Sequence, residues 1–165
     1  MTTFSLRSTT PSAAWPPTAG LVVCEKSGQW AQAWRRELGS GTRVVEARFV
    51  DDAWQQLQRF PHGALAMELR AEQSPQLVAL LARVQAERPH VLCVAHLTSE
   101  SPAWELLLRE AGALAIIASP RRMATAVTML HKHLARAPQP NLSFREAIWR
   151  QLPWSETPLP PASIH

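Results

Sequence analysis

The stretch GALAIIASPRR, residues 112–122, decides the fold. Its middle, residues 113–118, is short and continuously apolar, which is typical of a strand buried in a sheet. The Ser119-Pro120 pair that follows is typical of a helix start, because a serine hydroxyl can cap a helix and proline fits its first turn. The stretch therefore predicts a buried strand that leads directly into a helix.

Four more apolar runs of strand length precede this one at fairly even intervals. All but the second of the four are almost continuously apolar. This is the pattern of central and edge strands in a parallel sheet that is covered on both faces. The runs are GLVVC (20–24), RVVEA (43–47), ALAM (64–67) and VLCVA (91–95).

The segments between the runs have the spacing of helices, with apolar residues three or four positions apart on one helix face. Strand and helix alternate five times, which predicts an α/β fold: a (βα)5 doubly wound parallel sheet of five strands, in the order 2-1-3-4-5, with helices on both faces. The helical stripes are Trp30, Trp34 and Leu38; Ala53, Trp54, Leu57 and Phe60; Leu77, Leu80, Leu81 and Val84; Leu107, Leu108 and Ala111; and Met123, Val127, Leu130 and Leu134.

The other helix starts also carry capping residues. The Ser-Pro pairs at 74–75 and 101–102 combine an N-cap hydroxyl with a proline at the first helical position. Ser27 and Asp51 lie where the remaining two helices begin, and both residue types accept backbone N–H groups there. We therefore expect a side-chain cap at every helix start.

The composition fits one compact domain with extensions. The chain has 165 residues, of which 46% are hydrophobic, enough for a substantial core. It has no apolar run long enough to cross a membrane and no secretory signal at its start, so we expect a cytoplasmic protein without membrane contact. A net charge of +4 favours acidic partners, and no acidic residue lies between Glu110 and Glu146.

The domain is expected to span residues 20–137, between two extensions. Residues 1–19 are rich in serine, threonine and proline but hold a single arginine, which favours a disordered arm over a transit peptide. Residues 138–165 form a proline-rich tail. Within it a short amphipathic helix is predicted over 144–152, after a Ser-x-x-Glu capping box at 143–146. Two interpretations stay open: this helix packs on its own domain, or it enters a groove of another protein.

Motifs of catalysis and metal binding are absent from the sequence. His131 and His133 lie two positions apart, so that on a helix they face different directions and cannot share one ion. There is no glycine-rich phosphate loop, no paired-cysteine metal motif and no nucleophile elbow. Cys24 and Cys93 fall in apolar runs two strands apart, and we expect free thiols. The sequence thus predicts no enzyme, no cofactor and no metal.

Residues 20–137 resemble the receiver domain of two-component response regulators. The most specific match is Gly112-Ala113, then five residues, then Ser119-Pro120, which is similar to the Gly-Ala and Lys-Pro pairs of that family. The resemblance implies the same fold and a site at the ends of its strands. In receivers the Lys-Pro peptide bond is commonly cis. Because the lysine is missing here, we expect a trans bond between Ser119 and Pro120.

The resemblance also implies which positions would carry receiver chemistry. Receivers hold Mg²⁺ with an acidic pair, accept phosphate on an aspartate, and stabilise it with a hydroxyl and the lysine. In this chain the acidic pair falls on Cys24 and Glu25, the acceptor on Glu68, the hydroxyl on Ala95 (with His96 one residue beyond), the lysine on Ser119 and the switching aromatic on Ile116.

These substitutions imply a degenerate phosphorylation site. Glutamate places its carboxylate differently from aspartate, and the groups that stabilise a transferred phosphate are missing, so we expect a pseudo-receiver without phosphotransfer. One hypothesis is that Glu68 imitates a phosphorylated aspartate, but the favoured interpretation is a polar residue at a strand end. A rival hypothesis is residual Mg²⁺-dependent chemistry at Glu25 and Glu68.

The sequence therefore favours a non-catalytic interaction or regulatory module in bacterial signalling that works without phosphorylation. The receiver resemblance makes residues 101–136 an output and dimer surface, so a protein partner, acidic or with an apolar groove, and a homodimer are expected. The alternative is a nucleic-acid-associated regulatory factor that binds through the basic C-terminal face, although no helix-turn-helix supports it. The expected partner-binding residues are Arg121, Arg122, Lys132, Arg136, Phe144, Ile148, Trp149, Leu152 and Trp154.

Overall fold

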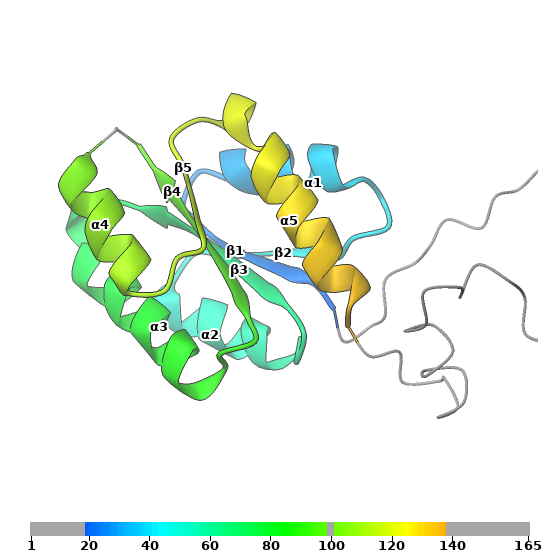
Figure 1. The fold of residues 1–165 in the computed structure, drawn as a ribbon, viewed down its shortest axis with the longest axis horizontal. Coiled ribbons are helices and arrows are strands. Elements are labelled where there is room, and N and C mark those ends of the chain that lie inside the picture. The colour runs from blue at the N-terminus through cyan, green and yellow to red at the C-terminus, as the bar shows by residue number, and fades with distance from the viewer. Residues whose placement is uncertain (1–18, 99–100, 138–165) are drawn as a thin grey trace, which may run out of the picture.

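A computed structural model describes residues 19–98 and 101–137 of the chain. These residues form a parallel sheet with the strand order β2-β1-β3-β4-β5, between two layers of helices (Figure 1). The predicted fold class and strand order are confirmed. The strands are β1 (Leu21–Cys24), β2 (Val44–Ala47), β3 (Ala64–Leu69), β4 (Leu92–Leu97) and β5 (Ala115–Ile117).

Helices α1 and α5 cover one face of the sheet, and α2, α3 and α4 cover the other (Figure 1). Most of the predicted apolar stripes face the sheet, but α4 buries only Leu108 and leaves Leu107 exposed. Single 3-10 turns, η1 (Ala71–Gln73) and η2 (Pro120–Arg122), precede α3 and α5. The α-helices are α1 (Gln29–Leu38), α2 (Val50–Gln58), α3 (Ser74–Glu87), α4 (Pro102–Glu110) and α5 (Ala124–Ala135).

Both faces of the sheet are apolar, because successive residues of a strand point to opposite faces. In β3, Ala64 and Ala66 pack towards α1 and α5, whereas Leu65 and Met67 pack towards the other three helices. Every residue of β3 and β4 is buried, as expected for central strands of a sheet covered on both sides. The core therefore has two layers, and a polar side chain in these strands needs a partner inside the protein.

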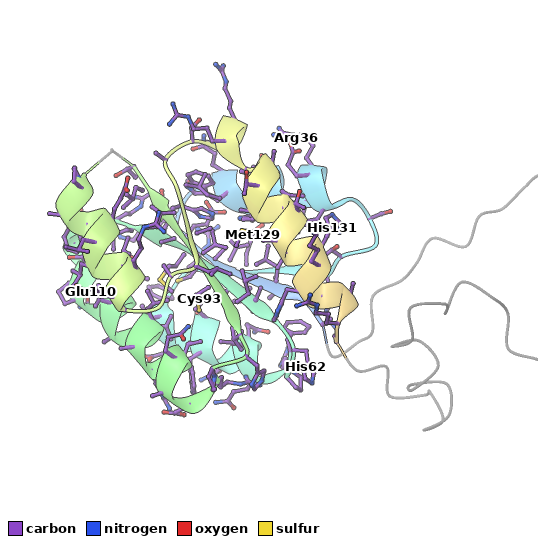
Figure 2. The ribbon with its side chains drawn as sticks, viewed as in Figure 1. Arg36, His62, Cys93, Glu110, Met129 and His131 are labelled. Atoms are coloured by element: carbon purple, nitrogen blue, oxygen red, sulfur yellow. The ribbon has the colours of Figure 1, made fainter. Side chains whose placement is uncertain are left out.

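The two cysteines are free thiols, as predicted. Cys93 lies between the sheet and the helices (Figure 2), and Cys24 is buried as well. Burial raises the pKa of Cys93 to about 12. Burial, together with the nearby carboxylates of Asp52 and Glu25, raises the pKa of Cys24 to about 11. Both thiols stay protonated at neutral pH, which makes them poor nucleophiles.

The start of the last helix differs in part from the prediction. Ser119 is a cap, since its Oγ accepts a hydrogen bond from the Arg121 N–H at 3.3 Å. The helix that it caps, however, is the single turn η2, and α5 begins only at Ala124. No peptide bond among the described residues is cis, so the bond between Ser119 and Pro120 is trans, as predicted.

Two other predicted caps are wrong, and a third is incomplete. α2 begins at Val50, so Asp51 lies inside its first turn, where its charge still favours the helix dipole. α3 continues from η1 with Ser74 as its first residue and Gln73 at the capping position. Ser101 occupies the capping position of α4, but its side chain makes no capping hydrogen bond. The path of the chain before each helix decides these starts, and a residue pattern does not reveal that path.

The predicted arm up to residue 18 and the predicted tail, 138–165, lie outside the described residues, and with them Phe144, Ile148, Trp149, Leu152 and Trp154. Ala19, at the end of the predicted arm, is buried in the core layer under α1 and α5. None of the described helices is long and apolar enough to cross a membrane.

Candidate functional site

Three buried ionisable side chains lie where the parallel strands end. Glu25 follows β1 and Glu68 lies near the end of the neighbouring β3. Glu68 is in register with His96 on β4, and His96 is in register with Ile117 on β5. The carboxyl edge of such a sheet is the usual place for a site. The structure thus brings the predicted acidic positions to one edge of the sheet. Each of the two carboxylates, however, binds a separate set of partners.

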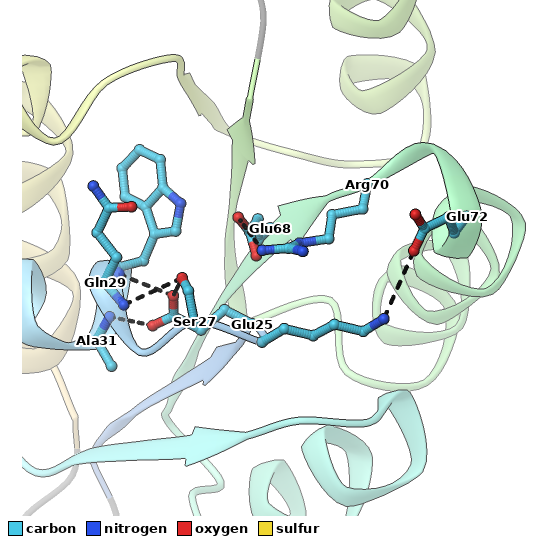
Figure 3. A network of polar contacts seen from close by, with 9 residues as sticks. Glu25, Ser27, Gln29, Ala31, Glu68, Arg70 and Glu72 are labelled. Atoms are coloured by element: carbon cyan, nitrogen blue, oxygen red, sulfur yellow. Dashed lines mark hydrogen bonds and ion pairs between the residues drawn. The ribbon is translucent and has the colours of Figure 1, made fainter.

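Glu25 is nearly buried, with 5% of the residue exposed. Its carboxylate accepts hydrogen bonds from the Trp30 N–H at 2.9 Å, from the Ala31 N–H, and from the Ser27 hydroxyl at 3.2 Å (Figure 3). α1 needs this acceptor because its N-cap residue is Gly28, which has no side chain. Ser27, the cap that the sequence predicted, accepts the Gln29 N–H at 3.4 Å. Glu25 accepts the next two N–H groups of α1, so both of its oxygens are engaged.

Glu68 is also buried, with 6% exposed. Arg70 donates to both of its oxygens, from Nε at 2.8 Å and from Nη2 at 3.2 Å (Figure 3). The backbone is still extended at Arg70, so the two side chains lie on the same side of the chain. The hydrogen bond to Glu68 raises the pKa of Arg70, which stays charged. The negative charge of Glu68 is thus neutralised by a bidentate ion pair with Arg70, which directly follows β3.

A second ion pair lies beside the first. Lys26 and Glu72 approach to 3.7 Å, and both side chains are largely exposed, so this contact stabilises the fold little. Lys26 is therefore paired with Glu72 and not with Glu68. Among the described residues, Arg70 is the basic side chain that forms a salt bridge with Glu68.

His96 is completely buried (0% exposed) between β4 and α1. Its ring stacks on that of Trp30, with centroids 3.9 Å apart, and its Nε2 accepts a hydrogen bond from the Trp34 Nε1–H at 3.1 Å. Burial lowers the pKa of His96 to about 3. The imidazole is therefore neutral, with its proton on Nδ1, and Nδ1 has no hydrogen-bond partner among the described residues.

The remaining predicted positions contribute no free reactive group. Ala95 is fully buried in the layer under α2, α3 and α4 and has no hydroxyl. The Ser119 hydroxyl is engaged as the cap of η2. Ile116 packs, half-buried, on the core, and the Cys24 thiol stays protonated. In the part of the chain that the structure describes, no three His, Cys, Asp or Glu side chains are placed to hold a metal ion.

Sequence reasoning missed two of these partnerships. The contact between Glu68 and Arg70 could have been predicted, because residues two positions apart in a strand share a face of the sheet. The contact of His96 with Trp30 and Trp34 had a weaker signal: the two tryptophans lie four positions apart on the face that α1 turns to the sheet. Nothing in the sequence showed that this face meets β4 at His96.

The predicted basic side chains are exposed along η2 and α5. Arg121 and Arg122 belong to η2, and Lys132 and Arg136 lie four positions apart near the end of α5. We call these four residues the basic surface. Arg36 of α1, which the sequence analysis did not include, is also exposed, and Figure 2 shows it on the same side of the molecule as His131 of α5.

Solved structures of response regulators share this fold. A response regulator from Thermotoga maritima superimposes with a TM-score of 0.61 at 18% identity, over 71% of this chain and 98% of that one. A CheY-like protein from Pseudomonas aeruginosa PAO1 gives a TM-score of 0.59 at 20% identity, over 73% and 97%. An orphan response regulator of H. pylori gives 0.59 at 13%, over 72% and 98%. No family model and no curated protein matches the sequence.

These likenesses define the class of protein by its architecture. The described chain has the fold of a response-regulator receiver domain, and the predicted structural resemblance is confirmed. At such low identities the likeness concerns the fold alone. The activity has to be argued from the side chains at the carboxyl edge of the sheet.

Proposed function

We propose that the protein is a pseudo-receiver: a non-catalytic module of bacterial signalling that binds a protein partner without being phosphorylated. The observation that carries this proposal is the ion pair between the buried Glu68 carboxylate and Arg70. The receiver resemblance assigns that carboxylate to the position of the phosphate acceptor.

Phosphoryl transfer to a carboxylate requires a free oxygen as nucleophile and positive charge to stabilise the transferred group. Both Glu68 oxygens accept hydrogen bonds from the Arg70 guanidinium. An attacking oxygen would have to leave a charge-assisted pair in a buried place, which is costly. The receiver fold also uses acids beside the acceptor to hold Mg²⁺, and the Glu25 oxygens are already bound to the start of α1.

The same ion pair argues against a permanent imitation of phosphoaspartate. A phosphate mimic acts through negative charge that other groups can read. The charge of Glu68 is taken up by Arg70, and the neighbouring positions Ala95 and Ser119 offer it no hydrogen bond. This favours a structural role for Glu68, as a fixed ion pair at the end of β3.

The direct test is exposure of the full-length protein to acetyl phosphate and Mg²⁺, followed by intact mass spectrometry. We expect no phosphorylated species, while a competent receiver domain in the same tube becomes modified and shows that the reagent is active. Stable phosphate on Glu68, or on any other residue of this edge, would overturn the proposal.

The partner that the charge pattern supports is an acidic protein surface that docks on the basic surface. Affinity capture from a nuclease-treated lysate would compare the wild type with Arg121→Glu/Arg122→Glu. The matched control is Arg48→Glu, a charge reversal of an exposed arginine between β2 and α2. We expect one protein to be lost with the double variant and retained by the control, and the purified pair to bind more weakly as salt is raised.

A nucleic-acid partner is the second candidate, favoured by the same exposed basic side chains. It predicts that the wild type binds oligonucleotides with a steep dependence on salt, and that Arg121→Glu/Arg122→Glu abolishes this binding. Oligonucleotide binding without a captured protein would replace the protein-partner proposal.

A further inference from the structure

Large exposed apolar side chains are concentrated on one edge of the described molecule. Leu106 and Leu107 of α4 are 61% and 40% exposed, and Leu114, just before β5, is 54% exposed. Elsewhere among the described residues only Phe49 is a comparably exposed large hydrophobic side chain. We call Leu106, Leu107 and Leu114 the α4–β5 apolar surface. Gathered apolar side chains of this kind mark an interaction site more often than single ones do.

A cavity of about 270 Å³ adjoins Leu114. Its walls come from α3, β4 and the end of α5, including Gln85, Cys93 and His133. This volume lies below the roughly 300–1,000 Å³ of typical small-molecule sites, which suits one large side chain better than a free ligand. Leu114 belongs both to the cavity wall and to the α4–β5 apolar surface, so one protein segment with an aromatic anchor can contact both.

The described chain ends beside this cavity. His133, which lines it, lies one helical turn before Ala137, the last described residue, and Ala137 is buried. Residues 138–143 can span up to about 20 Å when extended, since each residue adds roughly 3.3 Å. The segment that follows can therefore reach the cavity and Leu114 from its own domain.

The sequence of that segment matches the surface. Residues 144–152 have the apolar stripe Phe144, Ile148 and Leu152, and Trp149 borders it. The segment also carries Arg145 beside this stripe, while α4 carries Glu105 and Glu110, for which the described residues provide no salt bridge. Apolar pattern and charge therefore complement each other.

We propose that residues 144–152 dock on their own domain, with the apolar stripe on the α4–β5 apolar surface and Trp149 in the cavity beside Leu114. The short connection to Ala137 favours this segment over a second copy, because a tethered group has a high effective concentration at a nearby site. The inference goes beyond the proposed function: it assigns the tail to the domain itself and leaves the basic surface to a partner.

Disulfide trapping in the full-length chain tests the proposal, because both native cysteines are buried with protonated thiols. The test pair is Leu107→Cys with Ile148→Cys. One control moves the domain cysteine to Phe49→Cys at the start of α2, and another moves the tail cysteine to Arg150→Cys, on the opposite side of the predicted helix. Under mild oxidation we expect an intramolecular disulfide in the test pair at least tenfold faster than in either control.

Equal rates in all three variants would overturn the proposal. Predominant disulfide-linked dimers in the test pair would overturn it too, and would assign the surface to a second copy. As a test that needs no cysteine on α4, hydrogen exchange would compare the wild type with full-length Ile148→Asp and with the control Arg150→Gln. We expect faster exchange at residues 106–114 in Ile148→Asp only, and no difference would contradict docking. Neither readout involves phosphate or the basic surface, so failure here leaves the proposed function standing.

Discussion

The carboxyl edge of the sheet and the edge formed by α4 and β5 differ in whether their side chains are buried or exposed. At the carboxyl edge, Glu25 and Glu68 are buried and bound to partners within the chain. At the other edge, the large apolar side chains of Leu106 and Leu114 are exposed in the described structure. In this molecule the place where receiver-like folds react is closed by contacts within the domain, whereas the α4–β5 apolar surface is left uncovered by the described residues. Substitutions at the two edges should therefore differ sharply in their cost.

The largest effect is expected from Trp34→Ala at the closed edge. The substitution empties a fully buried site and removes the hydrogen bond to His96, which should lower the free energy of unfolding by about 3–5 kcal/mol. Urea unfolding measures this loss. Trp34→Phe separates the two causes, because it keeps most of the volume and leaves Nε2 of His96 without a donor, at a cost of about 1–3 kcal/mol. If both variants lose less than 1 kcal/mol, the edge is not closed as described.

Lowering the pH should reduce the free energy of unfolding, through His96 at the same edge. Its pKa in the folded protein is about 3, against 6.5 as the ordinary value, so between these values the unfolded chain binds a proton that the folded chain does not. The contribution of neutral His96 to the free energy of unfolding is therefore fully present above pH 6.5. It is lost as the pH drops towards 3, by up to about 1.4 kcal/mol per pH unit. Urea unfolding from pH 7 to 4.5 should show a steeper decline for the wild type than for His96→Phe. Parallel profiles would mean that His96 is not buried in its neutral form.

Breaking the Glu68 ion pair should have an intermediate effect. Arg70→Gln leaves a buried carboxylate with poorer partners. The loss should be about 2 kcal/mol, below the value for fully buried pairs because a third of the Arg70 side chain is exposed. Arg48→Gln, at an exposed arginine between β2 and α2, is the matched control and should change the stability by less than about 0.5 kcal/mol. Equal stabilities for Arg70→Gln and the control would show that the pair does not form.

The smallest effect is expected at the α4–β5 apolar surface. Leu106→Ala should lower the free energy of unfolding by less than about 1 kcal/mol, because the domain core leaves Leu106 largely exposed and only the proposed tail contact covers it. Leu108→Ala on the same helix removes a fully buried side chain and should cost about 2–5 kcal/mol. Thermal unfolding of the two variants gives the contrast within one helix. A similar loss in both would mean that Leu106 belongs to the domain core, and would contradict the α4–β5 apolar surface as described.

The sequence was sufficient to predict the architecture because each strand and helix has a recognisable pattern of apolar residues within its own segment. The apolar runs at 64–67 and 91–95 are buried on both sides, and residues such as Trp34 and Leu130 lie on the stripes that the spacing predicts. Strand order followed from the repeated alternation of strand and helix. These features depend on neighbours a few residues away.

The site was harder to predict because its contacts join distant residues or depend on backbone direction. The position of Glu68 was predicted, but its pairing with Arg70 depends on the chain staying extended beyond β3. The cap of α1 was assigned to Ser27, which accepts the Gln29 N–H, but nothing in the sequence showed that Glu25 also reaches the helix start. His96 and Trp34 lie far apart in the sequence and meet only when α1 packs on β4.

The most direct test of the closed edge is a titration of the full-length protein with Mg²⁺ and then beryllofluoride, a mimic of the acyl phosphate, followed through the backbone amide signals in NMR. We expect the signals of residues 24–31, 67–72 and 95–97 to stay in place, because the carboxylates of Glu25 and Glu68 are already bound within the chain. Saturable shifts confined to these three segments would contradict a receiver fold that works without phosphorylation.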